Sequence, residues 1–417
     1  MAIVKKEVLE GDLDSDQLSA GVDSGEPGIL ARARRIKRVV PSHLRDAFAT
    51  VIDEMSTPVT AIIDGKRKIL FGVNSYLGLN FHPACQKAAS DVIPDFGTGS
   101  TASRVAGGTS RLHVSLEQEI AQFYGRRQGI IYSTGFMANL GVISALVRPG
   151  DAIFLDAHCH ASIIDAARLS GAAFHFFKHN DEIDLLSLFR RIPIAGPRVL
   201  VVTEGLFSVS GDIAALDKIL PVAKEHGAVT LVDEAHSLGI YGENGRGVAE
   251  HCGVSDLADV IVGTFSKSAG VIGGFSVTDR DEFRDIWLLA RAYLYTASLP
   301  SSVVAAARQS LLVMRRESVW RDRLWENVEL LRKGMARAGV EISGCGPIGR
   351  ISIPMHAVGQ IWRALLDRGI YVNLLIPPAT PDGKAALRVS VSAAHSASDI
   401  DELIEAMKDV LGLVRAY

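Results

Sequence analysis

The segment Val260-Ile-Val-Gly-Thr-Phe-Ser-Lys-Ser268 is an apolar, strand-like run that ends in a lysine, Lys267. A similar run, Ala228-Val-Thr-Leu-Val232, lies earlier in the chain and leads into Asp233-Glu-Ala-His236. A lysine and an aspartate at the ends of two neighbouring strands are the groups that a pyridoxal phosphate enzyme requires. The lysine binds the cofactor aldehyde as a Schiff base, and the aspartate keeps the pyridine nitrogen protonated. The pair therefore predicts pyridoxal 5'-phosphate as the cofactor.

Three other kinds of site fit parts of the sequence less well. The Asp-Glu-Ala-His string also occurs in helicases, which need a Gly-x-x-x-x-Gly-Lys-Ser/Thr phosphate loop that this sequence lacks. The segment Gly97-Thr-Gly-Ser-Thr-Ala102 fits a loose nicotinamide-cofactor pattern, but the preceding Cys85–Ile93 has a helical rather than a strand pattern. The string His158-Cys-His160 has ligand side chains but no distant partner cluster, so no metal is expected.

Length and composition bound the class of protein. The chain has 417 residues, more than one ordinary hydrophobic core needs, so two lobes and extensions are expected. An apolar content of 48%, a charged content of 22% and a net charge of −3 are those of a soluble globular protein. They give no sign of a nucleic-acid or acidic-membrane partner. The cysteines are scattered, which indicates reduced thiols in a cytoplasmic protein: Cys85, Cys159, Cys252 and Cys345.

The N-terminal part differs from the rest of the chain. Residues 1–24 are acidic and polar without the apolar core of a secretory signal, which predicts a flexible tail. Residues 29–51 are rich in arginine and lysine and predict a basic helix. We favour a solvated helix face there over a helix that lies on the body or on a second subunit. No run of about 18 consecutive apolar residues occurs, so no transmembrane segment is expected.

From residue 68 onward, short apolar runs alternate with longer helical stretches, the pattern of a mainly parallel sheet covered on both faces. The expected strands are 129–132, 152–155, 198–203, 229–232, 260–264 and 274–277, and the expected helices are 137–146, 160–169, 183–190, 216–226 and 255–257. A long helical stretch, 301–338, then leads to a small lobe with strands at 340–342, 351–354, 371–373 and 386–392 and helices at 357–368 and 397–414. We expect an α/β protein with an N-terminal extension (1–60), a large domain (61–300), and a connecting helix with a small C-terminal domain (301–417).

Ligands of open parallel sheets bind at the carboxyl ends of the strands, and the candidate residues follow strand ends. Gly135, in Ser133-Thr-Gly-Phe-Met-Ala-Asn139, permits a tight turn into a helix whose free N–H groups suit a phosphate. An ordinary strand–helix turn is the alternative for this segment. Thr264 and Ser266, which flank the lysine, add hydroxyl donors for the same phosphate.

Three more polar residues each invite a functional interpretation. His160 is either a ring that lies on the cofactor or a structural histidine in a turn. His236, three residues after Asp233, is placed to face the phenolic oxygen of the cofactor. Arg388, in the apolar segment Leu387-Arg-Val-Ser-Val391, needs a partner for its charge. That partner is either a substrate carboxylate or an internal ion pair.

In these motifs the chain resembles the α-oxoamine synthases, pyridoxal phosphate-dependent enzymes of fold type I. The resemblance spans residues 60–410 in order, and the following segments carry it: Asn74-Ser-Tyr-Leu-Gly-Leu79, Ser103-Arg…Gly-Thr…His113-x-x-Leu-Glu117, Ser133–Asn139, His160-Ala-Ser162, Val232-Asp-Glu-Ala-His-Ser-Leu-Gly239, Gly263-Thr-Phe-Ser-Lys-Ser268, Thr296-Ala-Ser-Leu-Pro300 and Pro377-Pro-Ala-Thr-Pro381. It implies a large lobe with a mainly parallel, seven-stranded type of sheet and a smaller C-terminal α+β lobe. The stretches Gly205–Asp212 and Tyr371–Asn373 look most like those of bacterial members that condense serine with a long-chain acyl-CoA.

The resemblance also implies roles for the matching positions around the cofactor ring. Lys267 would hold the cofactor and act as the acid and base of the reaction. Asp233 would bind the ring nitrogen, and His160 would stack on the ring. His236 and Ser208 would bind the phenolic oxygen.

Substrate and phosphate contacts are implied in the same way. Asn74 and Arg388 would hold the amino-acid carboxylate. The residues that would bind the phosphate are Gly135, Phe136, Thr264, Ser266 and Thr296. Of these, Thr296 would come from the other subunit of an obligate homodimer. One position departs from the family pattern, because the residue before Pro377, commonly an arginine that reaches the substrate carboxylate, is Ile376 here. This change leaves Arg388 as the main carboxylate ligand and puts serine as the amino acid in question.

The resemblance implies a decarboxylating condensation of an amino acid, first L-serine, with a long-chain acyl-CoA, as in sphingolipid biosynthesis. The product would be an α-aminoketone such as 3-ketosphinganine. Alternatives within the family are alanine or glycine as the amino acid, or an acyl carrier protein as the acyl donor. Two further hypotheses are an aminotransferase of the same fold, which would use no thioester, and a cofactor-binding protein without catalysis.

Overall fold

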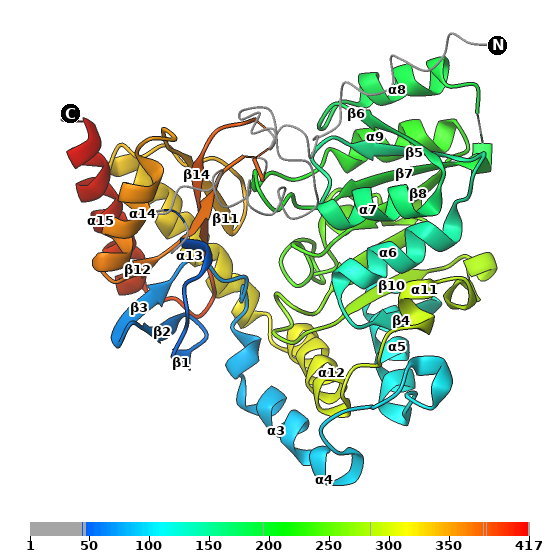
Figure 1. The fold of residues 1–417 in the computed structure, drawn as a ribbon, viewed down its shortest axis with the longest axis horizontal. Coiled ribbons are helices and arrows are strands. Elements are labelled where there is room, and N and C mark those ends of the chain that lie inside the picture. The colour runs from blue at the N-terminus through cyan, green and yellow to red at the C-terminus, as the bar shows by residue number, and fades with distance from the viewer. Residues whose placement is uncertain are drawn as a thin grey trace, which may run out of the picture.

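The computed structural model describes residues 44, 47–194, 196–283, 285–377, 379–380 and 382–415, and the structural statements below concern these residues. The predicted tail and most of the predicted basic helix lie outside them. The described chain forms two lobes, which are joined through the consecutive helices α12 (Ser301–Arg316) and α13 (Val319–Arg337) (Figure 1).

The larger lobe is built on a seven-stranded sheet, in which all strands run parallel except β10. In spatial order the strands are β4 (Gln128–Tyr132), β10 (Gly274–Thr278), β9 (Val260–Thr264), β8 (Val229–Asp233), β7 (Val199–Glu204), β5 (Ala152–Asp156) and β6 (Ala173–Phe177). The predicted strands of this lobe are confirmed. The sequence pattern does not predict β6, which lies at the edge of the sheet and buries only Phe177 fully.

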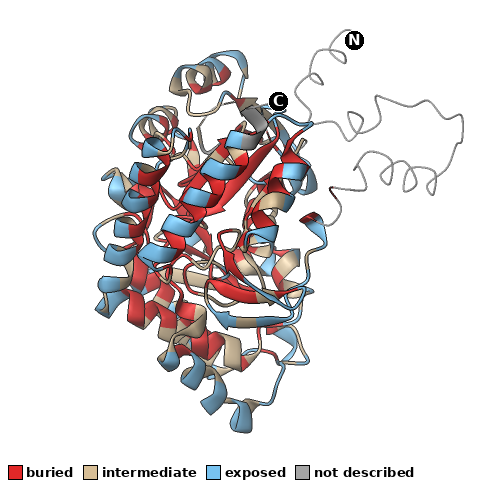
Figure 2. Ribbon diagram, turned by 90° about the vertical axis from the view of Figure 1, so that its left-hand side faces the viewer, coloured by how far each residue is buried: buried red, intermediate tan, exposed pale blue. Residues whose placement is uncertain are grey.

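Helices cover both faces of this sheet because alternate strand residues point to opposite sides. They are α5 (Arg111–Tyr124), α6 (Gly135–Leu146), α7 (Ala161–Ser170), α8 (Glu182–Arg191), α9 (Leu216–Glu225) and the short α10 (Val248–His251). Ile153 and Leu155 pack with α6 and α7, whereas Ala152 and Phe154 pack with α8 and α9. The strands are therefore buried on both sides, as the red strands of Figure 2 show. The predicted helices are confirmed, except that 255–257 is a single 3-10 turn.

The smaller lobe combines chain from both ends of the described residues (Figure 1). One sheet has the order β1 (Glu54–Thr57), β2 (Thr60–Ile63), β3 (Lys66–Leu70) and β12 (Ile370–Tyr371), and a second has the order β11 (Ile348–Ser352), β14 (Ala386–Ser390) and β13 (Asn373–Leu375). The helices α14 (Val358–Asp367) and α15 (Ala397–Arg415) pack on each other, and α15 packs on α13. The predicted helices at 357–368 and 397–414 are thus confirmed.

The hairpin of β2 and β3 is not predicted by the sequence pattern, although its turn has a clear signal. Asp64 and Gly65 have φ values of 51° and 68°, as the Asp-Gly pair of a type I′ turn requires. Because β3 pairs with β12, this hairpin lies with the smaller lobe. We expected the large domain to begin at residue 61, and the domain bounds stay a prediction.

Two expectations for the C-terminal third are corrected. The helical stretch 301–338 is interrupted after Arg316, because the backbone of Glu317, with φ −125° and ψ 80°, leaves the helical conformation. The indole of Trp320 donates a hydrogen bond to the Glu317 carboxylate at 3.0 Å, which holds the bend between the two helices. The segment 340–342 is not a strand, because it makes no ladder with a neighbouring strand.

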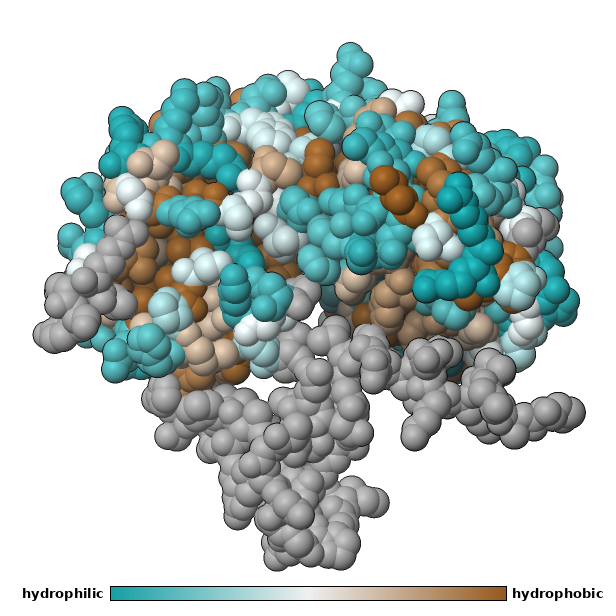
Figure 3. All heavy atoms as spheres, turned by 90° about the horizontal axis from the view of Figure 1, so that it is seen from above, coloured by the Kyte–Doolittle hydropathy of each residue, from teal (hydrophilic) through white to brown (hydrophobic). Residues whose placement is uncertain are grey.

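The surface seen from above is mostly hydrophilic, and apolar residues appear on it as separate patches (Figure 3). Within the described ranges, no helix combines the length and the apolar character needed to cross a membrane. The same ranges contain no group of three or more His, Cys, Asp or Glu side chains arranged to hold a metal ion.

A polar network fastens the loop between β7 and α9, which carries Ser208, to the carboxyl ends of β5 and β6. His179 lies between two carboxylates, with Nδ1 2.8 Å from Asp156 Oδ1 and Nε2 2.7 Å from Asp212 Oδ2. Its ring also stacks on His158 with 3.8 Å between centroids. Burial alone lowers the pKa of His179, but the hydrogen bonds and charges of the two carboxylates outweigh burial and raise it to about 9.

We expect His179→Gln to destabilise the protein most at neutral and lower pH. The folded-state pKa of about 9 lies above the ordinary 6.5, so the stabilisation is fully present below pH 6.5 and lost as the pH rises through 9. Its size is roughly 3 kcal/mol, which urea-unfolding curves between pH 6 and 10 would measure. His175→Gln is the matched control, because His175 lies on β6, four residues before His179, and its pKa is lowered by burial and by Arg191. A stability gap for His179→Gln that stays constant from pH 6 to 10 would mean that His179 is neutral when folded.

Candidate active site

The carboxyl ends of the central strands line one pocket in the larger lobe. Lys267 follows β9, Asp233 ends β8 and Glu204 ends β7, while His160 lies between β5 and α7. Because β7, β8 and β9 are parallel neighbours, their ends bring these side chains together from distant parts of the sequence. Together with His236, the pocket therefore combines a lysine, two acids and two histidines.

The carboxylate of Asp233 is buried and held in one orientation. Its Oδ2 accepts a hydrogen bond from Asn139 Nδ2 at 2.7 Å, and its Oδ1 accepts one from the backbone N–H of Ala235 at 2.9 Å. The same Asn139 amide donates to Ser162 Oγ at 3.0 Å, which links α6 to α7 beside the pocket. A buried carboxylate that is fixed in this way can accept a further hydrogen bond from a protonated ring nitrogen.

The amine of Lys267 lies in the same pocket, and no hydrogen-bond acceptor is assigned to it among the described residues. Its pKa is lowered to about 8, chiefly because burial penalises the ammonium form. The negative charges of Asp233 and Glu204 oppose this effect, and the positive charge of Arg388 adds to it. A lysine with a lowered pKa is neutral often enough near pH 7 to act as a nucleophile or base.

Burial shifts the pKa values of Glu204, His160 and His236 toward favouring their neutral forms. Burial, followed by the charge of Asp233, raises the pKa of Glu204 well above its ordinary value. Burial lowers the pKa of His160 and lowers that of His236 still further. His160 is held by its own backbone, whose N–H donates to Glu204 Oε1 at 2.5 Å, and its ring nitrogen Nδ1 lies 2.8 Å from Ser162 Oγ.

The start of α6 forms a cradle for an anion. Thr134 caps this helix, its hydroxyl accepts from the N–H of Met137 at 3.1 Å, and the first-turn N–H groups of Gly135 and Phe136 have no partner within the helix. A Cβ added to Gly135 would lie 2.9 Å from the Cβ of Thr264, so a side chain would fill the cradle. The Thr264 hydroxyl lies 2.7 Å from Ser266 Oγ on the other side. An amine, an oriented carboxylate and a phosphate cradle in one pocket fit pyridoxal phosphate.

Arg388, on β14 of the smaller lobe, is 7% exposed and has no carboxylate within 4.0 Å among the described residues. Its guanidinium donates to Asn74 Oδ1 at 3.0 Å and to the Tyr76 hydroxyl at 3.3 Å, while its buried Nε has no partner. The Tyr76 hydroxyl in turn lies 2.8 Å from His236 Nδ1. The internal ion pair that was the alternative for Arg388 is therefore not seen, and a chain of polar contacts joins it to the Lys267 pocket.

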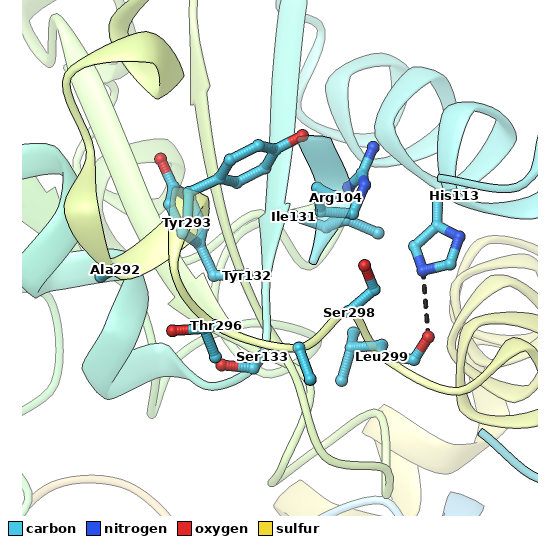
Figure 4. A pocket seen from close by; sticks show the side chains of 11 residues that line it. Arg104, His113, Ile131, Tyr132, Ser133, Ala292, Tyr293, Thr296, Ser298 and Leu299 are labelled. Carbon is cyan, nitrogen blue, oxygen red and sulfur yellow. Dashed lines mark hydrogen bonds between the residues drawn. The ribbon is translucent and has the colours of Figure 1, made fainter. Parts of the chain in front are cut away.

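Most of the predicted site residues meet in this pocket. They are Gly135, Phe136, His160, Asp233, His236, Thr264, Ser266 and Lys267. Asn74 and Arg388 adjoin it through Tyr76. Ser208 is half-buried and does not line the pocket. Thr296 lines a separate, small pocket under β4, together with Ser133 and Arg104 (Figure 4).

Sequence reasoning missed five residues that the structure brings to the site. They are Tyr76, Asn139, Ser162, Glu204 and Asn373. Two of them had a signal in the sequence, because an amide within the apolar helix of residues 137–146 and an acid at the end of a buried strand both need partners. The others are ordinary polar residues, whose roles depend on contacts across the lobes.

Comparison with known proteins identifies the family of this chain. Residues 66–407 match the family Aminotransferase class I and II. A serine palmitoyltransferase of Caulobacter vibrioides is 43% identical over 366 residues, which cover 87% of this chain and 90% of the relative. An 8-amino-7-oxononanoate synthase of Methylococcus capsulatus is 40% identical over 374 residues, which cover 88% and 95%. The solved structure of a serine palmitoyltransferase from S. paucimobilis, with bound PLP–myriocin, matches with a TM-score of 0.87 and 39% identity, and covers 93% of this chain and 98% of that one. This chain therefore belongs to the α-oxoamine synthase family and is a pyridoxal phosphate-dependent acyltransferase of fold type I.

Proposed function

We propose that this enzyme condenses L-serine with a long-chain acyl-CoA and releases CO2, free CoA and an α-aminoketone of the 3-ketosphinganine type. The observation that carries the amino-acid half is Arg388, a buried cation beside the Lys267 pocket that has no carboxylate partner in the part of the chain that the structure describes. The likeness to relatives named serine palmitoyltransferase supports both the reaction class and serine as the first substrate. Sphingolipid biosynthesis in the cytoplasm is the setting that this activity implies.

The residues that would hold the cofactor follow from the pocket. Lys267 binds its aldehyde carbon, Asp233 accepts the hydrogen bond of its ring nitrogen, and the start of α6 with Thr264 and Ser266 takes its phosphate. The ring of His160 would supply a face for stacking, and His236, with Ser208 from the loop between β7 and α9, would serve the phenolic oxygen. When bound, pyridoxal phosphate supplies the electron sink for the pair of electrons left at the amino-acid α-carbon.

The amino acid is positioned from the smaller lobe. The guanidinium of Arg388 donates to the substrate carboxylate, and the amide of Asn74 contacts the same group. Because Tyr76 Oη accepts from Arg388 and lies 2.8 Å from His236 Nδ1, Tyr76 links the proposed carboxylate ligand to the histidine of the pocket. Binding of the carboxylate thus sets the α-carbon relative to Lys267.

Lys267 carries out the proton transfers at the α-carbon. Its amine, with a pKa lowered to about 8, takes the α-proton and later returns a proton to the same carbon. Between these events the α-carbon forms a bond to the thioester carbonyl carbon, the CoA thiolate leaves, and the carboxylate departs as CO2. The other candidate bases are less suited to this step, because burial lowers the pKa of His160, which weakens it as a base, and raises the pKa of Glu204, which favours its protonated form.

We also propose an obligate homodimer in which Thr296 joins the phosphate site of the partner subunit. Thr296 lies outside the Lys267 pocket of its own chain. Its neighbour Tyr295 is 74% exposed, and Val105, on the segment that pairs with this loop, is 51% exposed. Two large apolar side chains at adjacent, exposed positions are typical of a surface that a second subunit covers.

The first test is a panel of amino acids and acyl donors. We expect the highest kcat/KM with serine and a long-chain acyl-CoA, and one free thiol released for each α-aminoketone detected by mass. Alanine, glycine and an acyl carrier protein form the other arms of the panel. Preference for one of these would assign the chain to another branch of the family. Amino-group transfer to a 2-oxo acid without thiol release would instead make it an aminotransferase.

The second test addresses the carboxylate site. Arg388→Ala should weaken serine binding about ten- to a hundredfold, because it removes a charge-assisted contact worth roughly 1.5–3 kcal/mol. Spectral titration of the cofactor with serine measures this. Arg350→Ala is the matched control, since Arg350 faces Arg388 on the adjacent strand but pairs with Asp382 at 2.8 Å. We expect Ile376→Arg to tighten serine binding. Unchanged serine affinity in Arg388→Ala would remove Arg388 from the substrate site.

A further inference from the structure

Residues 103–117 lie outside the Lys267 pocket, yet they contain a buried ion pair. Arg104 donates from both terminal nitrogens to the two carboxylate oxygens of Glu117, at 2.9 and 3.1 Å, and its Nε donates to Thr109 Oγ1 at 3.0 Å. Arg104 is 9% exposed. A buried ion pair adds little net stability, because desolvation offsets its attraction, so its main effect is to fix the groups that it touches.

One of these groups is the strand that leads into the phosphate cradle. Glu117 Oε1, besides its ion pair, accepts a hydrogen bond from the backbone N–H of Ile131 at 3.2 Å. Ile131 lies on β4, and Ser133 with Thr134 follows directly before α6. The ion pair thus holds the carboxyl end of β4 against α5 and sets where the cradle of the same subunit begins.

The other group is the loop that carries Thr296. His113, on the first turn of α5, is 1% exposed, and its Nε2 lies 3.0 Å from the carbonyl oxygen of Leu299 (Figure 4). Its Nδ1 accepts from the N–H of Ser110 at 3.2 Å, so Nε2 carries the proton and donates to Leu299. Burial, and then the charge of Arg104, lowers the pKa of His113 to about 4, which keeps this ring neutral.

The backbone of the Thr296 loop is fixed at further points on the same segment. The N–H of Ser298 donates to the carbonyl of Ala102 at 2.9 Å, and the Ser100 hydroxyl donates to the carbonyl of Ser298 at 2.8 Å. A Cβ on Gly108 would lie 2.4 Å from Ser298 Oγ, so the two chain segments touch without room for a side chain. The path of the loop is therefore set by its contacts with residues 100–113.

We propose that Arg104, Glu117 and His113 form a positioning cluster. The cluster sets the position of Thr296, which serves the partner's phosphate site, relative to the phosphate cradle of its own subunit. This inference rests on the proposed homodimer with Thr296 in the partner's site. The cluster touches neither substrate nor cofactor. It acts through the loop of residues 296–299 on one side and through β4 on the other.

Glu117→Gln is the direct test, because it keeps the side-chain shape and removes the charge that Arg104 binds. We expect the holoenzyme dimer to bind pyridoxal phosphate about tenfold more weakly, a change on the scale of one charge-assisted hydrogen bond, measured by cofactor dissociation rather than by turnover. Glu119→Gln is the matched control: Glu119 lies on the same helix and pairs with Arg308 of α12, at 2.7 Å from the guanidinium Nε. It should leave cofactor affinity unchanged.

A double-mutant cycle with Thr296→Ala separates positioning from the shared site. Thr296→Ala alone should weaken cofactor binding, and Glu117→Gln should then add much less than its own tenfold factor. If Glu117→Gln does not fold, Ser100→Ala takes its place in the cycle with Thr296→Ala. This change removes one hydrogen bond that holds the loop and leaves the ion pair intact. Full additivity would overturn the positioning role while leaving the shared site intact. An unchanged affinity in Thr296→Ala would instead refute the shared site and, with it, this inference.

Discussion

The structure depends on two side chains of opposite charge that meet in one pocket at the ends of neighbouring parallel strands. β8 ends in Asp233 and β9 leads to Lys267, and their pairing in one register brings carboxylate and amine into one buried pocket. Burial lowers the pKa of the lysine, the charges of Asp233 and Glu204 raise it, and the net value is about 8. The balance leaves an amine that is available for covalent chemistry at a pH at which ordinary lysines are charged.

The remaining parts of the site serve to hold this pair and to bring a substrate to it. Asn139 reaches from α6 to orient Asp233, so the helix that supplies the phosphate cradle also fixes the acid. The smaller lobe contributes Arg388, which meets Asn74 and Tyr76 from the chain between the lobes. The proposed amino-acid site therefore lies where the lobes meet, whereas the proposed cofactor contacts come from the larger lobe.

The strand-end residues could be predicted from the sequence because apolar runs show where a buried strand ends. A polar residue at that point needs a hydrogen-bond partner or a ligand. Asn139 and Glu204 were missed although the sequence shows that a buried amide and a buried acid need partners, because those partners lie far away in the chain and cannot be identified from a local pattern. The edge strand β6 was missed for a related reason, as it has little buried surface. The break at Glu317 was missed because the helical pattern continues through it, although the Trp320 side chain that bonds to Glu317 lies only three residues further along the chain.

The most direct test of the central claim is to locate the lysine that carries the cofactor. Borohydride reduction of the holoenzyme fixes pyridoxal phosphate to its lysine, and peptide mass spectrometry then identifies the modified residue. Lys68 is an internal control, because it is a second buried lysine whose pKa burial lowers, but it donates to the carbonyl of Leu366 in the smaller lobe. The account predicts the added mass on the peptide with Lys267 and its loss in Lys267→Arg, whereas modification of Lys68 or of any other lysine in place of Lys267 would contradict it.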